Sequence, residues 1–309
     1  MRNYFAREIS ALAAEMKDVY LVYGDIGNRL FDEFKRVAPN RFVNAGIAEA
    51  SMISVAAGIA KSGFLPFVYT INPFIYLKAL EQIKLDVCYP KLPVIMVGTG
   101  GGLAYSELGT THHSLEDVGV LRNVPNLQVF VPSDEIELVA TIRTVISRKE
   151  PAYIRIGKKE SERVHEDGSI PETLKDEFVL VKECAGSSTA LVTYGTIATE
   201  AKKAHEELIA NLRLDLWTAP KLRPISQDFL EKFLARYSRV FVVEEHRSTG
   251  GLFSILAEAS AMNHLSTGAR LYSFNSGDQF HTGLGTQENA RKSLKLDAES
   301  IVKRVLSET

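Results

Sequence analysis

The sequence is poor in cysteine and contains no long apolar run. Cys88 and Cys184 are the only cysteines among 309 residues, and no cysteine or histidine spacing resembles a zinc site. No apolar stretch reaches the length of a membrane span, and residues 1–9 lack the apolar core of a signal peptide. We therefore expect two reduced thiols, no metal ligands in this chain and a cytoplasmic location.

The sequence also lacks an excess of charge of either sign. It has 36 lysines and arginines against 38 aspartates and glutamates, a formal net charge of −2. This balance gives no electrostatic footprint for nucleic acid or a membrane surface. With 45% hydrophobic residues the chain can bury a large core, and its length favours two domains.

What the sequence does have is a regular alternation of apolar runs and helical patterns. In the first half the runs of strand length are residues 19–23, 42–44, 65–70, 94–98, 127–132 and 152–156, and the helical patterns are residues 4–16, 48–61, 77–87 and 134–148, the last opening at Ser133. After a charged segment, residues 158–182, the strands are expected at 189–194, 214–218, 240–243 and 270–274, and the helices at 197–211, 225–237, 251–263 and 298–306. Continuous apolar strands between helices are typical of parallel sheets covered on both faces. We therefore predict an α/β fold of two doubly wound parallel-sheet domains, residues 1–175 and 176–309.

Glu49 is the one carboxylate in a predicted helix made largely of alanine, serine and glycine. It lies just beyond the carboxyl end of a predicted strand, where open parallel sheets bind their ligands. A glutamate is seldom buried without a partner. Glu49 is therefore either a first-turn residue that complements the helix dipole or a functional carboxylate that faces a specific partner.

A glycine-rich loop, residues 98–113, leads to two adjacent histidines. Its glycines match neither the P-loop nor the dinucleotide fingerprint, so it is a weak nucleotide signature. His112 and His113 can donate to a ligand and move protons near neutral pH. A loop histidine can equally be a solvated surface residue.

Lys78 and Arg155 interrupt apolar segments at the same end of the predicted sheet. A cation in such surroundings needs an anion or an exit to solvent. The two side chains either converge on an anionic substrate group or form internal ion pairs, for which Asp25 and Glu116 are the candidate partners.

Taken in order, these segments resemble the C-terminal half of the transketolases over the whole chain. The motifs are Gly-Asp-Ile at 24–26, Asn-Ala-Gly-Ile-Ala-Glu-Ala-Ser-Met at 44–52, Thr-Ile-Asn-Pro-Phe at 70–74, Gly-Thr-Thr-His-His-Ser-Leu-Glu-Asp at 109–117, Val-Pro-Ser-Asp at 131–134, Tyr-Ile-Arg-Ile-Gly at 153–157 and Val-Val-Glu-Glu-His at 242–246. The chain looks like the second subunit of a split, two-gene transketolase. The resemblance implies a pyrimidine-binding domain at 1–175, a transketolase C-terminal domain at 176–309, and transfer of a two-carbon ketol unit between sugars or sugar phosphates.

The resemblance also implies a thiamine diphosphate site that is shared with another chain. Transketolases hold the diphosphate and Mg²⁺ through a Gly-Asp-Gly segment followed by an asparagine, and this sequence contains no Gly-Asp-Gly. We therefore expect a partner, the N-terminal transketolase subunit, to supply the diphosphate and Mg²⁺ end of the site. Symmetry then favours an α2β2 assembly.

Position by position, the resemblance assigns roles to residues of this chain. Glu49 matches the glutamate that hydrogen-bonds N1′ of the aminopyrimidine and favours its imino tautomer, and Phe74 matches an aromatic residue packed on that ring. Asp25 and Ile26 match residues beside the cofactor. His112 matches a histidine that contacts substrate, and with Glu49 it completes the expected catalytic residues.

The remaining matches concern the substrate. Arg155 matches a basic group for a sugar phosphate, Lys78 a position that is basic in the related deoxyxylulose-phosphate synthases, and His113 lies beside the substrate histidine. Two positions depart from the family: a leucine, Leu108, replaces an acid expected to contact a sugar hydroxyl, and Gly100 replaces a second substrate histidine. These departures favour a less hydroxylated, deoxy or otherwise modified sugar.

Two other functions stay open at this point. One is the β subunit of the first component of a 2-oxo acid dehydrogenase, which shares the domain pair and the pyrimidine glutamate. The other is a non-catalytic interaction subunit. In the predicted second domain, residues 244–246 and 277–281 are interpreted as structural rather than catalytic.

Overall fold

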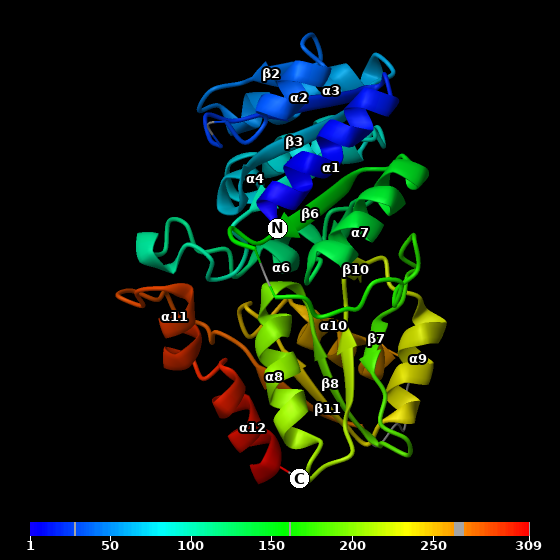
Figure 1. The fold of residues 1–309 in the computed structure, drawn as a ribbon, viewed down its shortest axis with the longest axis vertical. Coiled ribbons are helices and arrows are strands. Elements are labelled where there is room, and N and C mark those ends of the chain that lie inside the picture. Colours follow the sequence, from blue (N-terminus) through cyan, green and yellow to red (C-terminus); the bar gives the residue numbers. More distant parts are fainter. Residues whose placement is uncertain (28, 161, 263–268, 309) are drawn as a thin grey trace.

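The computed structural model describes residues 1–27, 29–160, 162–262 and 269–308. Its strands form two separate sheets with helices on both faces, and the first half of the chain lies above the second half in Figure 1. The predicted α/β fold is confirmed. The boundary at residues 175 and 176 stays a prediction, and positions 28, 161 and 263, which fall in predicted segments, lie outside the described residues.

The first sheet has seven strands, of which all but one are parallel. In spatial order they are β10 (Lys221–Arg223), β5 (Gln128–Phe130), β6 (Ala152–Ile156), β4 (Ile95–Thr99), β3 (Leu65–Ile71), β1 (Val19–Tyr23) and β2 (Phe42–Asn44). β10 runs antiparallel to β5 and comes from the second half of the chain. The six strands predicted for the first half are all present, with bounds that shift by no more than two residues.

Helices cover both faces of the first sheet. They are α1 (Arg2–Glu15), α2 (Asp32–Val37), α3 (Glu49–Lys61), α4 (Asn72–Lys78), α5 (Leu80–Gln82), the π-helix η1 (Ile83–Cys88), the 3-10 helix η2 (Ser106–Leu108), α6 (Asp117–Leu121) and α7 (Glu135–Arg148). The buried faces of α1 and α7 pack on one side of the sheet, and those of α3, α4 and η1 pack on the other.

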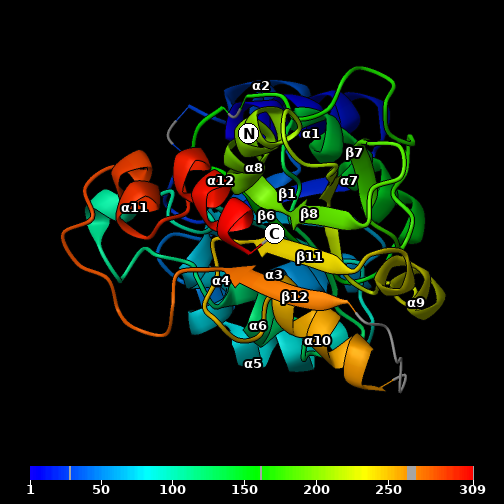
Figure 2. The same ribbon diagram turned by 90° about the horizontal axis from the view of Figure 1, so that it is seen from below.

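The second sheet has five strands, in the order β12 (Arg270–Phe274), β11 (Arg239–Val243), β8 (Thr189–Thr193), β9 (Asp215–Thr218) and β7 (Val179–Lys182). Its helices are η3 (Gly195–Ile197), α8 (Ala198–Leu208), α9 (Gln227–Arg236), α10 (Leu252–Met262), α11 (Gln287–Ser293) and α12 (Ala298–Ser307). Figure 2 shows α8 and α12 on one side of this sheet and α10 on the other. Only β7 is antiparallel to its neighbour among the described strands of this sheet.

One apolar core joins the two sheets. Val68 and Met96 of the first sheet and Val192 and Val242 of the second belong to the same cluster of fully buried side chains. Burial of apolar surface is the main favourable contribution to folding. The two halves are therefore packed against each other as parts of one structure.

The helix predicted at 77–87 is wrong as a single element. The chain enters α4 directly from β3, because Pro73 occupies the first turn, where its missing N–H costs nothing. α4 ends at Lys78, and Ala79 has non-helical dihedrals before α5 and η1 continue. The segment directly after β3 is thus a helix.

Other elements also differ from the prediction. Asp134, rather than Ser133, is the N-cap of α7, since its carboxylate accepts from the backbone N–H groups of Ile136 and Glu137. The short helices α2, α6 and α11 and the strands β7 and β10 were not predicted. The three helices have five to seven residues, which is too few to show a helical periodicity. None of the helices in the described ranges is long and apolar enough to cross a membrane, and both cysteines are free.

A buried ion pair ties the segment after β6 to both sheets. His165 Nε2 lies 2.8 Å from Glu137 Oε1 on α7 and 3.1 Å from Thr218 Oγ1 on β9. Burial alone would lower the pKa of His165, but the charge of Glu137 and the hydrogen bond to it raise that pKa. Burial alone would raise the pKa of Glu137, but His165 lowers it. Asp134 also faces the pair and accepts from the His165 N–H.

We expect His165→Gln to destabilise the protein in a pH-dependent way. Because the folded-state pKa of His165 is raised above 6.5 and that of Glu137 is lowered below 4.5, the pair contributes its full stability between these values. That contribution is lost as pH rises through the raised pKa of His165. Urea unfolding should give a loss on the order of 3 kcal/mol near pH 5.5 and a smaller loss near pH 9.

His205→Gln is the matched control. His205 is also buried, but burial lowers its pKa and its Nε2 faces the carbonyl oxygen of Leu214 at 2.8 Å. Its neutral form is the one that the fold stabilises, so the destabilisation in this variant should not shrink as pH rises. A loss for His165→Gln that is the same at every pH would contradict the ion pair.

Candidate active site

The loops after β1 and β2 are held together at the start of α3. The backbone N–H of Asp25 donates to the carbonyl oxygen of Gly46 at 3.1 Å, and the Gly46 N–H donates to Asn44 Oδ1 at 2.8 Å. Gly46 has φ of +69°, a conformation that favours glycine. This turn brings Glu49 to the first position of α3 at the carboxyl end of the sheet.

The Glu49 side chain is only 8% exposed, and its partner is a lysine on the neighbouring helix. Lys78 Nζ lies 3.2 Å from Glu49 Oε2, and the Lys78 side chain is 48% exposed. Of the two alternatives for Lys78, the structure gives an ion pair, but its partner is Glu49 and neither of the candidates, Asp25 and Glu116. The carboxylate lies under the surface, with its cation at the rim.

Lys78 begins a row of contacts that continues through aromatic rings. Its Nζ lies 4.4 Å from the ring centroid of Phe74, and the Phe74 and His112 rings meet edge to face at 5.3 Å. His112 then contacts Tyr105 at 5.9 Å between ring centroids, and Lys158 Nζ lies 4.5 Å from the Tyr105 ring. Glu49 lies at one end of this row of contacts. We call the whole set the Glu49 row: Glu49, Lys78, Phe74, His112, Tyr105 and Lys158.

The loop that carries His112 is closed at its base. Gly102 and Ser114 form a two-way backbone pair, both bonds at 3.0 Å. Near the tip, the N–H groups of His112 and His113 both donate to the carbonyl oxygen of Gly109. Burial lowers the pKa of His112, so its imidazole is neutral near pH 7 and offers one donor and one acceptor.

Tyr105 explains why residue 100 has no side chain. Gly100 has φ of +81°, and a Cβ built on it would lie 2.0 Å from the Tyr105 ring. The space assigned to a second histidine is thus filled by a phenol ring from the same loop. Leu108, the other departure, is half exposed on η2.

Arg155 lies in a buried polar network rather than at the rim. Its Nη1 donates to Asp117 Oδ1 at 3.1 Å and its Nη2 donates to the carbonyl oxygen of Glu245 at 3.0 Å. Burial alone would lower the pKa of Arg155, but the charge of Asp117, together with smaller contributions from neighbouring groups, raises that pKa. The structure gives the internal ion pair that the sequence left open, but with Asp117 in place of Asp25 or Glu116. A substrate role for Arg155 stays a prediction.

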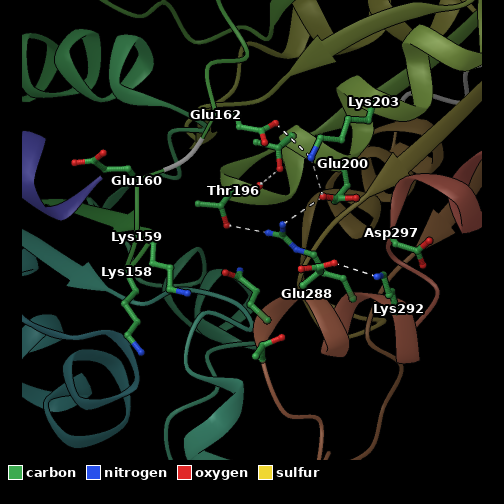
Figure 3. Close-up of a pocket in the computed structure, with 15 residues that line it drawn as sticks. Lys158, Lys159, Glu160, Glu162, Thr196, Glu200, Lys203, Glu288, Lys292 and Asp297 are labelled. Atoms are coloured by element: carbon green, nitrogen blue, oxygen red, sulfur yellow. Dashed lines mark hydrogen bonds and ion pairs between the residues drawn. The ribbon is translucent and has the colours of Figure 1, made fainter.

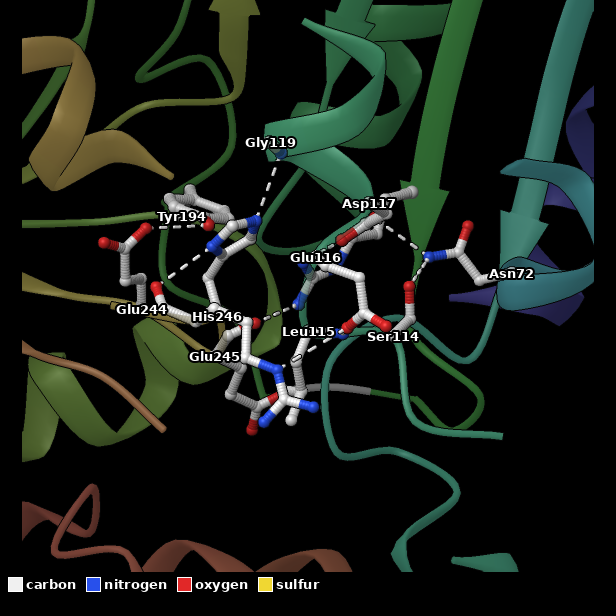
Figure 4. A network of polar contacts seen from close by, with 12 residues as sticks. Asn72, Ser114, Leu115, Glu116, Asp117, Gly119, Tyr194, Glu244, Glu245 and His246 are labelled. Carbon is white, nitrogen blue, oxygen red and sulfur yellow. Dashed lines mark hydrogen bonds and ion pairs between the residues drawn. The ribbon is translucent and has the colours of Figure 1, made fainter. Parts of the chain in front are cut away.

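The same network holds the start of α4 and the end of the His112 loop (Figure 4). Asn72 Nδ2 donates to Ser114 Oγ at 2.5 Å and to Asp117 Oδ2 at 2.9 Å. The Tyr153 hydroxyl donates to Asp117 Oδ2 at 2.5 Å and also contacts Asn72 Oδ1. Since Asn72 is the first residue of α4, the network fixes that helix relative to the His112 loop.

The remaining predicted residues lie in different surroundings. Asp25 is exposed and Ile26 is partly buried, beside the turn that leads to Glu49. His113 is buried, and its Nε2 lies 3.5 Å from the carbonyl oxygen of Ser106. It therefore points into its own loop. The cofactor and substrate roles of these residues stay predictions.

The residues after β11 have the structural contacts that we expected. Glu244 accepts from the N–H of Leu252 at 2.8 Å and caps the start of α10. Glu245 accepts from Arg291 Nε at 2.7 Å, and His246 Nε2 accepts from the Gly119 N–H at 3.2 Å (Figure 4). All three side chains are buried and engaged within the protein.

A pocket of about 660 Å³ lies between the segment after β6, the start of α8 and α11. Figure 3 shows lysines and carboxylates that line it and form ion pairs, among them Lys203 with Glu162 and, within α11, Lys292 with Glu288. None of the eight predicted site residues, all of which the structure describes, lines this pocket. Lys158 is the one residue of the Glu49 row that it shares.

Sequence reasoning missed Tyr105, Lys158, Asn72 and Asp117. Lys158 is a cation just after β6, three residues beyond Arg155, which we had predicted as a site cation. Asn72 and Asp117 lie in two of the quoted motifs, but the resemblance assigned them no role, and Tyr105 carried no signal beyond its place in a strand-end segment. In the described parts of the chain no group of three or more His, Cys, Asp or Glu side chains is placed to hold a metal ion.

Two family models match this chain. The model described as the transketolase pyrimidine binding domain covers residues 1–163, and the model described as the transketolase C-terminal domain covers residues 179–301. The chain is also similar to a solved structure described as a split gene transketolase, inactive beta4 tetramer. That similarity has a TM-score of 0.85 and 26% identity, and it covers 99% of this chain and 96% of the other.

Curated relatives agree with these matches. One subunit of the apulose-4-phosphate transketolase of Actinobacillus succinogenes is 32% identical over 304 residues, which cover 97% of this chain and 95% of that protein. A 6-deoxy-6-sulfo-D-fructose transketolase subunit of a Clostridium strain is 30% identical over 234 residues, which cover 74% of this chain and 70% of that protein.

We expect Arg155→Met to destabilise the protein much more than Lys158→Met, because Arg155 is a buried structural cation and Lys158 lies at the edge of the site. Loss of Arg155 leaves the Asp117 carboxylate fully buried without its cation, which costs on the order of 3–5 kcal/mol. Lys158 lies at the rim, where it forms an ion pair with Glu107 at 3.9 Å, so Lys158→Met should cost less than about 1 kcal/mol. Urea unfolding of both variants measures this difference. Equal losses of stability would contradict the assignment.

Proposed function

The chain belongs to the transketolase family, and from this premise we propose that it is the pyrimidine-side subunit of a split transketolase. In this proposal it transfers a two-carbon ketol unit between sugars or sugar phosphates once a partner completes the site. The observation that carries the proposal is the Glu49 row. It joins a buried carboxylate, an aromatic ring and a neutral histidine at the carboxyl end of the first sheet.

The residues present fit the pyrimidine end of thiamine diphosphate, the cofactor of this family. Glu49 is a nearly buried carboxylate at the surface edge of α3, with Phe74 one contact away through Lys78. A carboxylic acid at this place can hold a proton toward a ring nitrogen, and an aromatic side chain can pack on the ring. When bound, the cofactor supplies the carbanion chemistry. Glu49 orients its ring, and His112 contacts the sugar.

We propose that the partner binds next to Glu49 and supplies the diphosphate and Mg²⁺ site. The outward face of α3 carries the small or exposed residues Ser51, Val55 and Gly58. Three large apolar side chains on neighbouring segments are mostly exposed: Ile47 (81%), Leu77 (61%) and Tyr89 (83%). Exposed apolar groups gathered around a site mark an interaction surface. An α2β2 assembly in the cytoplasm is part of this proposal.

The substrate proposed here is a sugar that is modified relative to the ordinary pentose phosphates. The relatives named for apulose 4-phosphate and 6-deoxy-6-sulfofructose support this, as does the Tyr105 ring in the place of a polar side chain at Gly100. Lys158, beside Tyr105, is the cation best placed for a phosphate or sulfonate group.

We expect Glu49→Gln to abolish ketol transfer without disturbing assembly. The amide keeps the size of the side chain but cannot exchange the proton, so the rate of the assembled enzyme should fall by about 10²–10⁴-fold. Assembly is followed by sedimentation with the N-terminal subunit, thiamine diphosphate and Mg²⁺. Glu33→Gln, which changes an exposed carboxylate on α2, serves as the control.

The isolated chain should show no ketol transfer under the same conditions. Transfer by the purified single chain would sink the split-subunit proposal. An unchanged rate for Glu49→Gln in the complex would instead favour a non-catalytic subunit.

A donor screen tests the substrate class. The assembled enzyme should use 6-deoxy-6-sulfofructose or apulose 4-phosphate at least about tenfold better in kcat/KM than xylulose 5-phosphate with ribose 5-phosphate, because one missing polar partner in a sugar site changes discrimination by this order. Turnover of xylulose 5-phosphate at the rate of the modified sugars would argue against the modified-sugar hypothesis. Pyruvate and branched 2-oxo acids are included, since their turnover would indicate the dehydrogenase alternative.

A further inference from the structure

Three hydrogen bonds connect the loop that carries His112 to segments that follow strands of the second sheet. We call these three contacts the latch: Thr110 Oγ1 to the His281 carbonyl oxygen at 3.1 Å, the Arg247 N–H to the Leu115 carbonyl oxygen at 2.6 Å, and the Leu103 N–H to Glu245 Oε2 at 3.1 Å. They contact the start, the tip and the end of the loop. In both Figure 1 and Figure 2, α11 lies beside the segment around residues 106–108.

The far side of the latch is itself fixed. His281 is buried, and its Nε2 lies 2.7 Å from the carbonyl oxygen of Ser276. The Ser276 N–H donates in turn to the carbonyl oxygen of His246 at 2.9 Å, at the end of β11. Glu245 is held by Arg291 at 2.7 Å. The latch therefore connects the His112 loop to the rigid end of a buried strand.

The loop that carries His112 has little regular structure of its own. Between the backbone pair of Gly102 with Ser114, the described loop contains only one turn of 3-10 helix, η2. Thr110 lies two residues before His112, in the turn whose Gly109 carbonyl accepts both histidine N–H groups. A loop without regular structure keeps one conformation only when surrounding contacts fix it.

Arg247 adds a charge to the same connection. Its side chain contacts the Gln279 carbonyl oxygen, lies 3.9 Å from Glu116 at the end of the loop and 5.5 Å from the ring of Phe280. One arginine thus contacts both the His112 loop and the segment that carries His281.

We propose that the second domain is a positioning element for substrate binding: through the latch it fixes the loop so that His112 faces Phe74 and the sugar. This inference rests on the proposed function for the role of His112. It gives the C-terminal domain a part in sugar recognition, although the described contacts of that domain place none of its side chains in the Glu49 row.

Thr110→Val and Thr110→Ser form a matched pair that tests the proposal. Valine keeps the shape of the side chain and loses the hydroxyl, whereas serine keeps the hydroxyl. Ser226→Ala is the control, because it removes the N-cap of α9 in the second domain far from the loop. The variants are compared as full chains by hydrogen exchange. Steady-state kinetics follow in complex with the N-terminal subunit, with 6-deoxy-6-sulfofructose and xylulose 5-phosphate as donor probes.

In Thr110→Val we expect amide exchange over residues 103–115 to become about fivefold faster, as for the loss of one hydrogen bond. KM for the donor should rise by a similar factor while kcat stays within about twofold. Thr110→Ser should restore both values, and Ser226→Ala should change neither. Ser226→Ala also weakens the fold. If the Thr110 contact only stabilised the fold, Thr110→Val and Ser226→Ala would therefore have the same effect on exchange in the loop and on KM.

Two results would overturn the proposal. Unchanged exchange in Thr110→Val would show that the latch does not hold the loop. Faster exchange with unchanged KM would show that the loop is held but does not position His112 for substrate. Failure of the proposed function is a separate result, namely no ketol transfer by the wild-type complex. Hydrogen exchange then still decides whether the latch exists.

Discussion

The ion pair between Arg155 and Asp117 is the interaction on which the rest of the site depends. A buried guanidinium is tolerated only with an anion and filled hydrogen bonds, and here the charge pair gathers groups from several elements. Asp117 also accepts from Asn72 and Tyr153, and Arg155 reaches the backbone of Glu245. The start of α4, the end of the His112 loop and the end of β11 therefore meet at one point.

This arrangement leaves the side chains of the Glu49 row on one edge of a rigid frame. Phe74 and Lys78 project from α4, and His112 comes from the loop that the same network closes at Ser114. Glu49 arrives from a different strand end, through the turn at Gly46. Each functional group is thus placed by backbone that is fixed elsewhere, which is the condition for a preorganised site. What the frame does not supply, in the proposed function, is the partner's half of the cofactor.

The sequence predicted those features that leave a pattern in neighbouring residues. Apolar periodicity predicted most strands and the long helices. The rule that ligands bind at strand ends and the transketolase motifs predicted the positions of Glu49, Phe74 and His112. Proximity through packing was not predictable. Asp117 was passed over for its neighbour Glu116, because which of two adjacent carboxylates faces inward depends on α6, a helix of five residues. Tyr105 entered the site only because a glycine at 100 leaves room for its ring.

The apolar core that runs from the first sheet to the second has a mechanical consequence. Side chains from both sheets belong to one buried cluster, so rotating one half against the other would expose part of that surface to water. Within the described residues, this shared core therefore opposes rotation of one sheet against the other. In the proposed function, access for a sugar would then come from the open edge beside Glu49 or from movement between subunits. In that proposal, the timing of substrate entry and product release is set by the assembly.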